Sequence, residues 1–112
     1  MPTQPIHLAL DELEQALRTL ALWQETPPSA EALASEMPFC LDTLAFHEWL
    51  QFILLDRFRQ MLRREAMMPA EMALYPMATE VYKSSLAEHA LLLQALARLD
   101  EAVTGRPVAR EG

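Results

Sequence analysis

The sequence is poor in cysteine and glycine. Its 112 residues include one cysteine and two glycines. A single thiol, at Cys40, cannot form a disulfide within the chain, which fits a reducing compartment. No apolar run approaches the roughly 18 residues of a membrane-spanning helix. No basic region precedes Asp11 as it would in a secretory signal peptide. The sequence therefore predicts a cytoplasmic protein without a membrane segment.

Positive charge is also scarce. Nine Lys and Arg residues stand against 16 Asp and Glu residues, so the formal net charge is −7. This charge favours solubility and opposes general binding to nucleic acid or to an anionic membrane. Direct binding of nucleic acid is therefore disfavoured, although a local basic patch on an acidic protein can still contact phosphates.

The composition and the placement of proline predict an all-α fold. Apolar residues make up 52% of the chain, and the helix-favouring residues Ala, Leu, Met and Glu are abundant. The eight prolines fall at or near the ends of long periodic segments and not inside them, as helices require. We predict a compact four-helix bundle of three long helices and one short helix. The predicted helices span residues 6–24, 30–35, 42–64 and 77–104.

A chain of this length corresponds to one domain, and we place it at residues 1–104. The apolar residues of the first predicted helix recur at steps of four and three, at Ile6, Leu10, Leu13, Leu17 and Leu20. That spacing predicts one buried face. The chain end, residues 105–112, is expected to be a disordered tail.

The segment FCLDTLAFHEWLQFILLDRF contains five residues that we single out as a structural motif, Asp42, Thr43, Glu48, Trp49 and Gln51. Asp42 or Thr43 is expected to cap the start of the third helix. Trp49 is expected to lie in the core. Glu48 and Gln51 are expected to make polar contacts that fix neighbouring segments.

The histidines do not predict a metal site. His47 and Glu48 match the start of the zinc-protease motif HExxH, but glutamine occupies position 51, where the motif needs its second histidine. His7, His47 and His89 lie on three different predicted helices, and nothing in their spacing requires them to converge. We therefore expect no bound metal.

The sequence also lacks the signatures of common enzymes. It has no Gly-rich phosphate loop and no Ser-His-Asp signature. Cys40 could act as a nucleophile, but its neighbours Phe39 and Leu41 are apolar and would raise the pKa of its thiol, so we interpret it as a buried structural residue. The sequence thus predicts no catalytic residue and no cofactor, and a protein that is not an enzyme.

Four arginines form the candidate interaction patch of this chain: Arg57, Arg59, Arg63 and Arg64. One interpretation is that they only compensate the negative end of the third helix. The alternative is that they recognise an acidic partner or a phosphate backbone. Arg57 directly follows the apolar run, so we expect it to be partly buried and to have a carboxylate or carbonyl partner.

The methionines cluster in and around the connection before the last helix, at Met61, Met67, Met68, Met72 and Met77. Such clusters can fill an irregular core or line a groove for a partner. The high apolar fraction of a short chain favours a protein partner or self-association, since either would cover excess apolar surface.

One long segment, PFCLDTLAFHEWLQFILLDRF, together with TLALWQ before it and MPAEMALYPMA after it, resembles the YqcC-like family of small bacterial proteins. The most specific part of the resemblance is the EWLQ core, Glu48 to Gln51. At Asp56 the chain departs from relatives that have proline before the arginine. The resemblance implies a compact all-helical fold and no established activity. It also implies an association with tRNA modification, because some relatives are encoded beside a tRNA pseudouridine synthase.

Three functional hypotheses follow. The first is a non-catalytic interaction module that binds a protein partner or a second copy of itself. The second is an accessory factor linked to tRNA modification, acting through the arginine patch. The third is a pocket between helices for a small apolar ligand.

Overall fold

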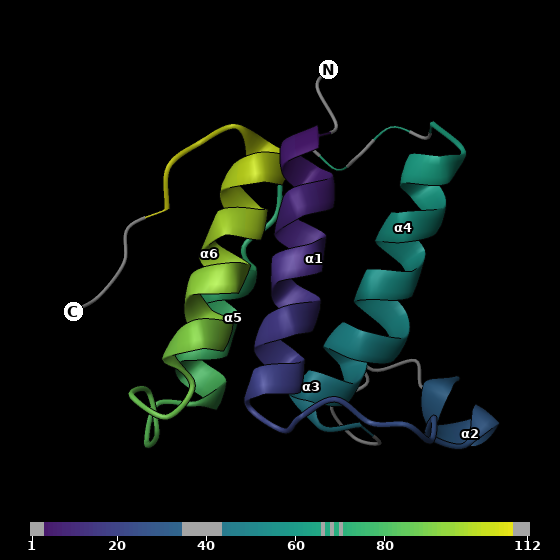
Figure 1. Ribbon diagram of the computed structural model, residues 1–112, viewed down its shortest axis with the longest axis vertical. Helices are drawn as coiled ribbons and strands as arrows, with labels where there is room; N and C mark the ends of the chain where they lie inside the picture. Colours follow the sequence, from purple (N-terminus) through teal and green to yellow (C-terminus); the bar gives the residue numbers. More distant parts are fainter. Residues whose placement is uncertain (1–3, 35–43, 66, 68, 70, 109–112) are drawn as a thin grey trace.

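The computed structural model describes residues 4–34, 44–65, 67, 69 and 71–108, and these form a helical bundle without a strand (Figure 1). The all-α prediction is confirmed. The elements are α1 (Gln4–Thr19), α2 (Ala30–Leu33), α3 (Phe46–Trp49), η2 (Leu50–Leu55), α4 (Asp56–Arg63), α5 (Leu74–Val81) and α6 (Ala90–Thr104). The radius of gyration is 13.7 Å, close to the roughly 13 Å expected of a compact domain of this length. Within these described ranges, no helix is both long enough and apolar enough to cross a membrane.

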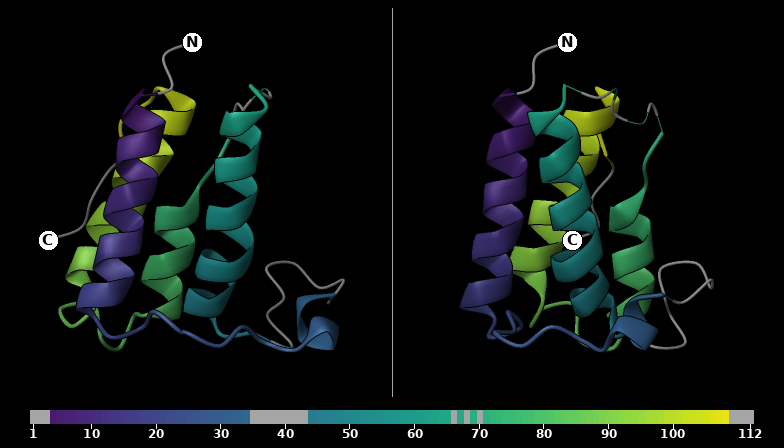
Figure 2. Two further views of the ribbon diagram at one scale, coloured as in Figure 1. Left: turned by 45° about the vertical axis from the view of Figure 1, so that its right-hand side comes forward. Right: turned by 90° about the vertical axis from the view of Figure 1, so that its right-hand side faces the viewer.

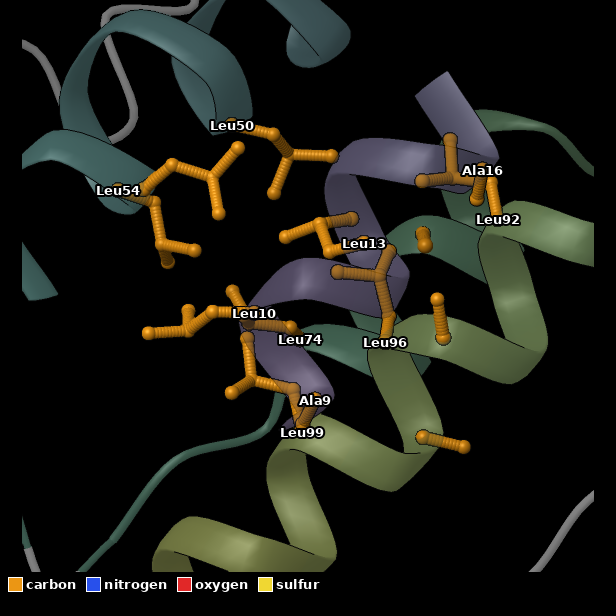
Figure 3. Close-up of a cluster of buried hydrophobic side chains, with 14 of the residues drawn as sticks. Ala9, Leu10, Leu13, Ala16, Leu50, Leu54, Leu74, Leu92, Leu96 and Leu99 are labelled. Atoms are coloured by element: carbon orange, nitrogen blue, oxygen red, sulfur yellow. The ribbon is translucent and has the colours of Figure 1, made fainter. Parts of the chain in front are cut away.

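The first and last helices pack side by side and run in opposite directions (Figure 1). The periodic residues of α1 are buried as their spacing predicted, with Ile6, Leu13 and Leu17 at 0% exposure. They meet the leucines of α6 in one cluster (Figure 3), which includes Leu92, Leu96 and Leu99. Burying these aliphatic side chains is the main favourable term in forming the bundle.

A continuous helix of residues 46–63, which we call the middle helix, covers the other side of α1 (Figure 1). Its residues Leu50 and Leu54 point into the same core, toward Leu10 and Leu13 (Figure 3). Its central turn, η2, is a π-helix. This wider turn is rare in proteins and occurs often at functional sites, and it was not predicted from the sequence.

The start of the middle helix differs from the prediction. The helix begins at Phe46 with Ala45 at its N-cap, and Leu44 and Ala45 are not helical, so neither Asp42 nor Thr43 caps it. Both of these residues lie outside the described part of the chain. The Ala45 side chain has no acceptor. Instead the Glu48 carboxylate accepts the backbone N–H of Ala45 at 2.8 Å, the return half of a capping box.

The predicted last helix, 77–104, is wrong as a single element, because residues 82–89 form turns between α5 and α6. Short-range hydrogen bonds outside the α-helical pattern form in this segment. The Ser85 backbone N–H donates to the Tyr82 carbonyl at 2.8 Å, and the Nδ1 atom of His89 lies 2.9 Å from the Ser85 carbonyl oxygen. The break lets α5 turn back and flank both α6 and the middle helix (Figure 2).

The first helix ends at Thr19 and not at Gln24. Ala21 adopts a left-handed conformation with φ 61°, and the Leu22 N–H donates to the Leu17 carbonyl at 2.8 Å. This is the pattern of a Schellman C-cap, with alanine in the place that glycine usually takes.

The chain end is described as far as Val108. The Val108 N–H donates to Glu101 Oε2 at 3.0 Å, its side chain packs against the core, and Arg106 pairs with Glu71 at 2.6 Å. Of the tail expected to be disordered, residues 109–112 lie outside the described residues. The domain boundary at 104 stays a prediction.

Candidate interaction groove

An apolar groove of about 280 Å³ lies between the middle helix and the start of α5, and we call it the α4–α5 groove. Its described lining residues are Trp49, Ile53, Leu54, Arg57, Phe58, Pro69, Met72, Ala73 and Leu74. All but Arg57 are apolar. The groove therefore presents an apolar surface that is bordered by one cationic group, the guanidinium of Arg57.

The middle helix forms one wall of the groove. Leu54 and Phe58 are buried, whereas Trp49 and Ile53 are half-buried and border open space. Ile53 and Leu54 belong to the π-helical turn, so this turn supplies part of the wall. Trp49 packs against the core and stacks on Phe46, with ring centroids 6.2 Å apart. It is thus a boundary residue and not a fully buried one.

The opposite wall consists of residues before α5 together with Leu74 at its start. A buried carboxylate from α6 fixes the start of this helix. Asp100 is 1% exposed. Its Oδ1 accepts the Leu74 N–H at 2.9 Å and its Oδ2 accepts the Tyr75 N–H at 2.8 Å. Asp100 therefore caps the N-terminus of a helix about 25 residues away in sequence, a position where negative charge is stabilised.

Burial raises the pKa of Asp100, the N–H groups of Tyr75 and Leu74 act in the opposite direction, and the nearby charge of Glu101 raises it further. A buried carboxyl group with a raised pKa is a candidate for acid–base chemistry. Here both carboxyl oxygens are already bonded to backbone N–H groups. The geometry supports a structural role for this residue.

The four arginines predicted as an interaction patch take different positions. Arg59 faces α1, where it contacts Asp11 Oδ1 at 3.2 Å and Glu14 Oε1 at 2.8 Å. Arg57, Arg63 and Arg64 are exposed, and none has an ion pair within the described residues. The expectation of a partly buried Arg57 is wrong, because its side chain is exposed and borders the groove. Its expected carboxylate or carbonyl partner is not found among the described residues and stays a prediction. Whether the four arginines act as an interaction patch stays a prediction.

The Arg59 contact belongs to a small ion-pair network on the surface of α1. Glu14 Oε2 also accepts from Arg18 Nε at 3.0 Å, and the Arg18 guanidinium lies 4.3 Å from the ring centre of Trp23. Partial burial acts to raise the pKa of Glu14, but Arg59 and Arg18 together outweigh it and lower that pKa. Arg59 therefore connects the middle helix to α1 through these ion pairs.

Gln51 makes the kind of polar contact that the sequence predicted for it. Its side chain is 8% exposed. It accepts the Gln24 N–H at 2.9 Å and donates to the Gln24 carbonyl at 2.7 Å. This pair attaches the segment after α1 to the π-helical turn.

The histidines lie apart, and the described residues contain no group of three or more His, Cys, Asp or Glu side chains that could hold a metal ion. His7 is exposed. His89 stacks on Tyr82 with ring centroids 4.0 Å apart, and burial raises the pKa of the Tyr82 hydroxyl. Cys40 lies outside the described residues.

Sequence reasoning missed both Asp100 and the groove wall that it supports. One signal was available, because Asp100 falls on the apolar face of the last helix, between Leu96 and Val103. An acidic residue in such a position is usually buried with a specific partner. Its partner, the start of α5, could not be predicted, because a single helix over residues 77–104 would keep Asp100 far from residues 74 and 75.

Comparisons with known proteins agree with the fold. The chain is 37% identical over 92 residues to an uncharacterized protein of Haemophilus influenzae, covering 82% of this chain and 86% of that protein. It is 30% identical over 95 residues to the uncharacterized protein YqcC of Escherichia coli, covering 85% and 87%. The solution NMR structure of YqcC superposes with a TM-score of 0.80 at 27% identity, covering 96% of this chain and 92% of that one.

A further match is to a much larger protein. Over 64 residues, 57% of this chain, the sequence is 41% identical to the tRNA pseudouridine synthase C of Pectobacterium carotovorum subsp. carotovorum, of which the match covers only 17%. A family model, DUF446, described as tRNA pseudouridine synthase C, matches residues 5–102. The resemblance noted from the EWLQ segment is confirmed, and the chain belongs to this DUF446 family of YqcC-like proteins.

Proposed function

We propose that this chain is a non-catalytic helical module that binds a tRNA pseudouridine synthase as its protein partner. The observation that carries the proposal is the match to a segment of such a synthase, at 41% identity but over only 17% of that protein. A segment similar to more than half of this chain therefore occurs within a synthase chain. A separate chain can supply the same module through a non-covalent interface.

A non-catalytic role agrees with the chemistry of the described residues. Their buried carboxylate, Asp100, is bonded through both oxygens to backbone N–H groups. Most of the Pectobacterium synthase lies outside the match, so the remainder of that protein is available to hold its reaction centre. The fold by itself does not identify the function, because one fold hosts many activities.

The charge of the chain favours a protein partner over tRNA. The net charge is −7, and Arg59 is already paired with Asp11 and Glu14. That leaves Arg57, Arg63 and Arg64 as exposed cations of the predicted patch. Three arginines on an acidic domain support weak contacts with phosphates at most. In this proposal the synthase recognises the tRNA, and the helical module positions or stabilises the synthase.

The test is direct binding between this chain and the tRNA pseudouridine synthase C encoded by the same genome. Both proteins are purified, mixed and analysed by light scattering and calorimetry at two salt concentrations, with an unrelated pseudouridine synthase as the control. We expect a defined complex with the first synthase only. The proposal would be overturned if the two proteins stay separate at about 50 μM, a concentration far above the dissociation constant of a specific complex.

The effect on tRNA modification gives a second readout. Pseudouridine formation by the synthase is measured with and without this chain, and a gel-shift series with tRNA alone is run over a range of salt. We expect the chain to change the activity or stability of the synthase and to leave free tRNA unshifted. A shift of tRNA by this chain alone, lost with rising salt, would favour the arginine-patch alternative.

A further inference from the structure

We propose that the α4–α5 groove receives an apolar segment of the partner that carries a carboxylate, and that Arg57 pairs with this carboxylate. The inference rests on the proposed function only for the identity of the partner. It names the surface used, the chemistry of the segment that fits it, and the residue that selects for acidic segments.

The groove is large enough to receive side chains of a protein segment. Its volume is about 280 Å³, near the lower end of the roughly 300–1,000 Å³ typical of small-molecule sites. That space accommodates one or two apolar side chains. A stable interface buries at least about 1,200 Å² in total, so the partner must also contact the rim. Met67, in the connection that supplies Pro69 and Met72 to the lining, is 93% exposed.

Both walls of the groove contain features that are uncommon in proteins. One wall contains the π-helical turn of residues 50–55, which is much rarer than an α-helical turn and occurs often at functional sites. The other is fixed by the buried carboxylate of Asp100, whose charge must be desolvated. Uncommon features of this kind concentrate at functional sites. Here they border the same groove.

The charge of Arg57 complements an acidic segment. Of the described cationic residues, Arg18, Arg59, Lys83, Arg98 and Arg106 each pair with a carboxylate of this chain. Arg57 has no such pair within the described residues, although the chain carries 16 acidic side chains. It borders an apolar surface, where a guanidinium can form two parallel hydrogen bonds to one carboxylate. The groove is thus a cationic site on an acidic protein.

Nucleic acid fits the same surface less well. Recognition of single-stranded nucleic acid needs a row of cations along the backbone and exposed aromatic faces for the bases. The groove has one cation, and its aromatic residues Trp49 and Phe58 are half-buried and buried. A second copy of this chain also carries acidic residues, 16 in all, so self-association through the groove is an alternative to a different partner. Both remain outcomes that the experiments below can detect.

The first experiment compares variants of this chain for binding to the full-length synthase. Arg57→Glu and Met72→Ala change the groove, and we expect each to weaken binding about tenfold or more. Arg57→Lys keeps the charge and is expected to weaken it only severalfold. The matched controls are Arg64→Glu, the same charge reversal outside the groove, and Leu91→Ala, a truncation of a 52% exposed leucine on α6.

The results separate the two proposals. If the unmodified chain binds the synthase and the groove variants bind equally well, the groove inference fails and the proposed function stands. An equal loss with Arg64→Glu would show general electrostatics and overturn the role of Arg57. The groove inference would also be overturned if binding to the synthase requires tRNA. The same holds if dimers of this chain cover the groove in solution.

The second experiment does not depend on the synthase. An array of 15-residue peptides, each with two leucines and one glutamate at helical spacing, is probed with this chain beside a matched array in which lysine replaces the glutamate. We expect the chain to prefer the acidic array, and Arg57→Glu to reverse that preference while Arg64→Glu leaves it unchanged. A chain that does not discriminate between the arrays, or an Arg57→Glu variant that still prefers the acidic one, would overturn the inference.

Discussion

The side-chain amide of Gln51 forms two hydrogen bonds with the backbone of Gln24, at 2.9 Å from its N–H and 2.7 Å to its carbonyl. The two residues are 27 positions apart in sequence. The amide satisfies both backbone groups of one residue, so it substitutes for secondary structure in a segment that has none. It also attaches that segment to the π-helical turn of the middle helix.

Gln51→Leu should destabilise the protein by about 1–3 kcal/mol, because two backbone groups lose their partner in a partly buried position. The free energy of unfolding is measured by urea denaturation. The matched control is Gln60→Leu, since the Gln60 amide bonds to the exposed Asp56 carboxylate, and we expect less than about 0.5 kcal/mol for it. Equal losses for the two variants would contradict the role assigned to Gln51.

Asp100→Ala should destabilise the protein by about 2–4 kcal/mol, because the buried N–H groups of Leu74 and Tyr75 both lose their acceptor. Amide hydrogen exchange at Leu74 and Tyr75 should accelerate more than exchange in the centre of α1. Glu80→Ala removes an exposed pair with Lys83 and serves as the control. A global loss without faster exchange at the start of α5 would argue against a capping role.

The stability contribution of Asp100 should depend on pH. Because its pKa is raised in the folded state, the folded protein binds a proton there more readily than the unfolded chain. The contribution is fully present below the ordinary value of about 3.9 and is lost as the pH rises through the folded-state pKa. Asp100→Asn does not titrate. The unfolding free energy of wild type minus that of Asp100→Asn should therefore decline from about pH 3 toward neutrality, and a rising difference would contradict the assignment.

Arg59→Ala should cost about 1 kcal/mol or less, since its pairs with Asp11 and Glu14 are partly exposed. The loss should shrink with added salt, which screens exposed pairs. Loss of Arg59 should also raise the pKa of Glu14 in an NMR titration, because Arg59 helps to lower it. Arg63→Ala, at an exposed position in the same helix, is the control for which no change is expected.

Ala21→Gly should stabilise the protein by about 0.5–1 kcal/mol. Ala21 has φ 61°, a conformation that costs an L-residue roughly 1–2 kcal/mol and glycine almost nothing. The gain is reduced by the greater freedom of glycine in the unfolded chain. Ala16→Gly, within α1 and 4% exposed, makes the same change in a helical conformation. It should instead lose about 1 kcal/mol, and a loss at both positions would contradict the prediction.

The sequence indicated part of the candidate site but not its surroundings. It identified Arg57 as unusual because this residue follows an apolar run. The expected carboxylate partner is not found among the described residues, and Arg57 borders an open groove instead. Met72 lines the α4–α5 groove and also packs against the core, so a role in partner binding stays a prediction. The π-helical turn has no local sequence signal that distinguishes it from a continuous α-helix.

What the sequence determined by itself is the helical class and the buried faces of the main helices. These properties are local, because apolar residues three and four positions apart share one side of a helix and proline marks its ends. The tertiary structure alone decided which side chain caps α5 and how Gln51 and Arg59 are partnered. Those contacts join residues 25 to 48 positions apart. No spacing rule within a helix specifies them, because they depend on how whole helices pack.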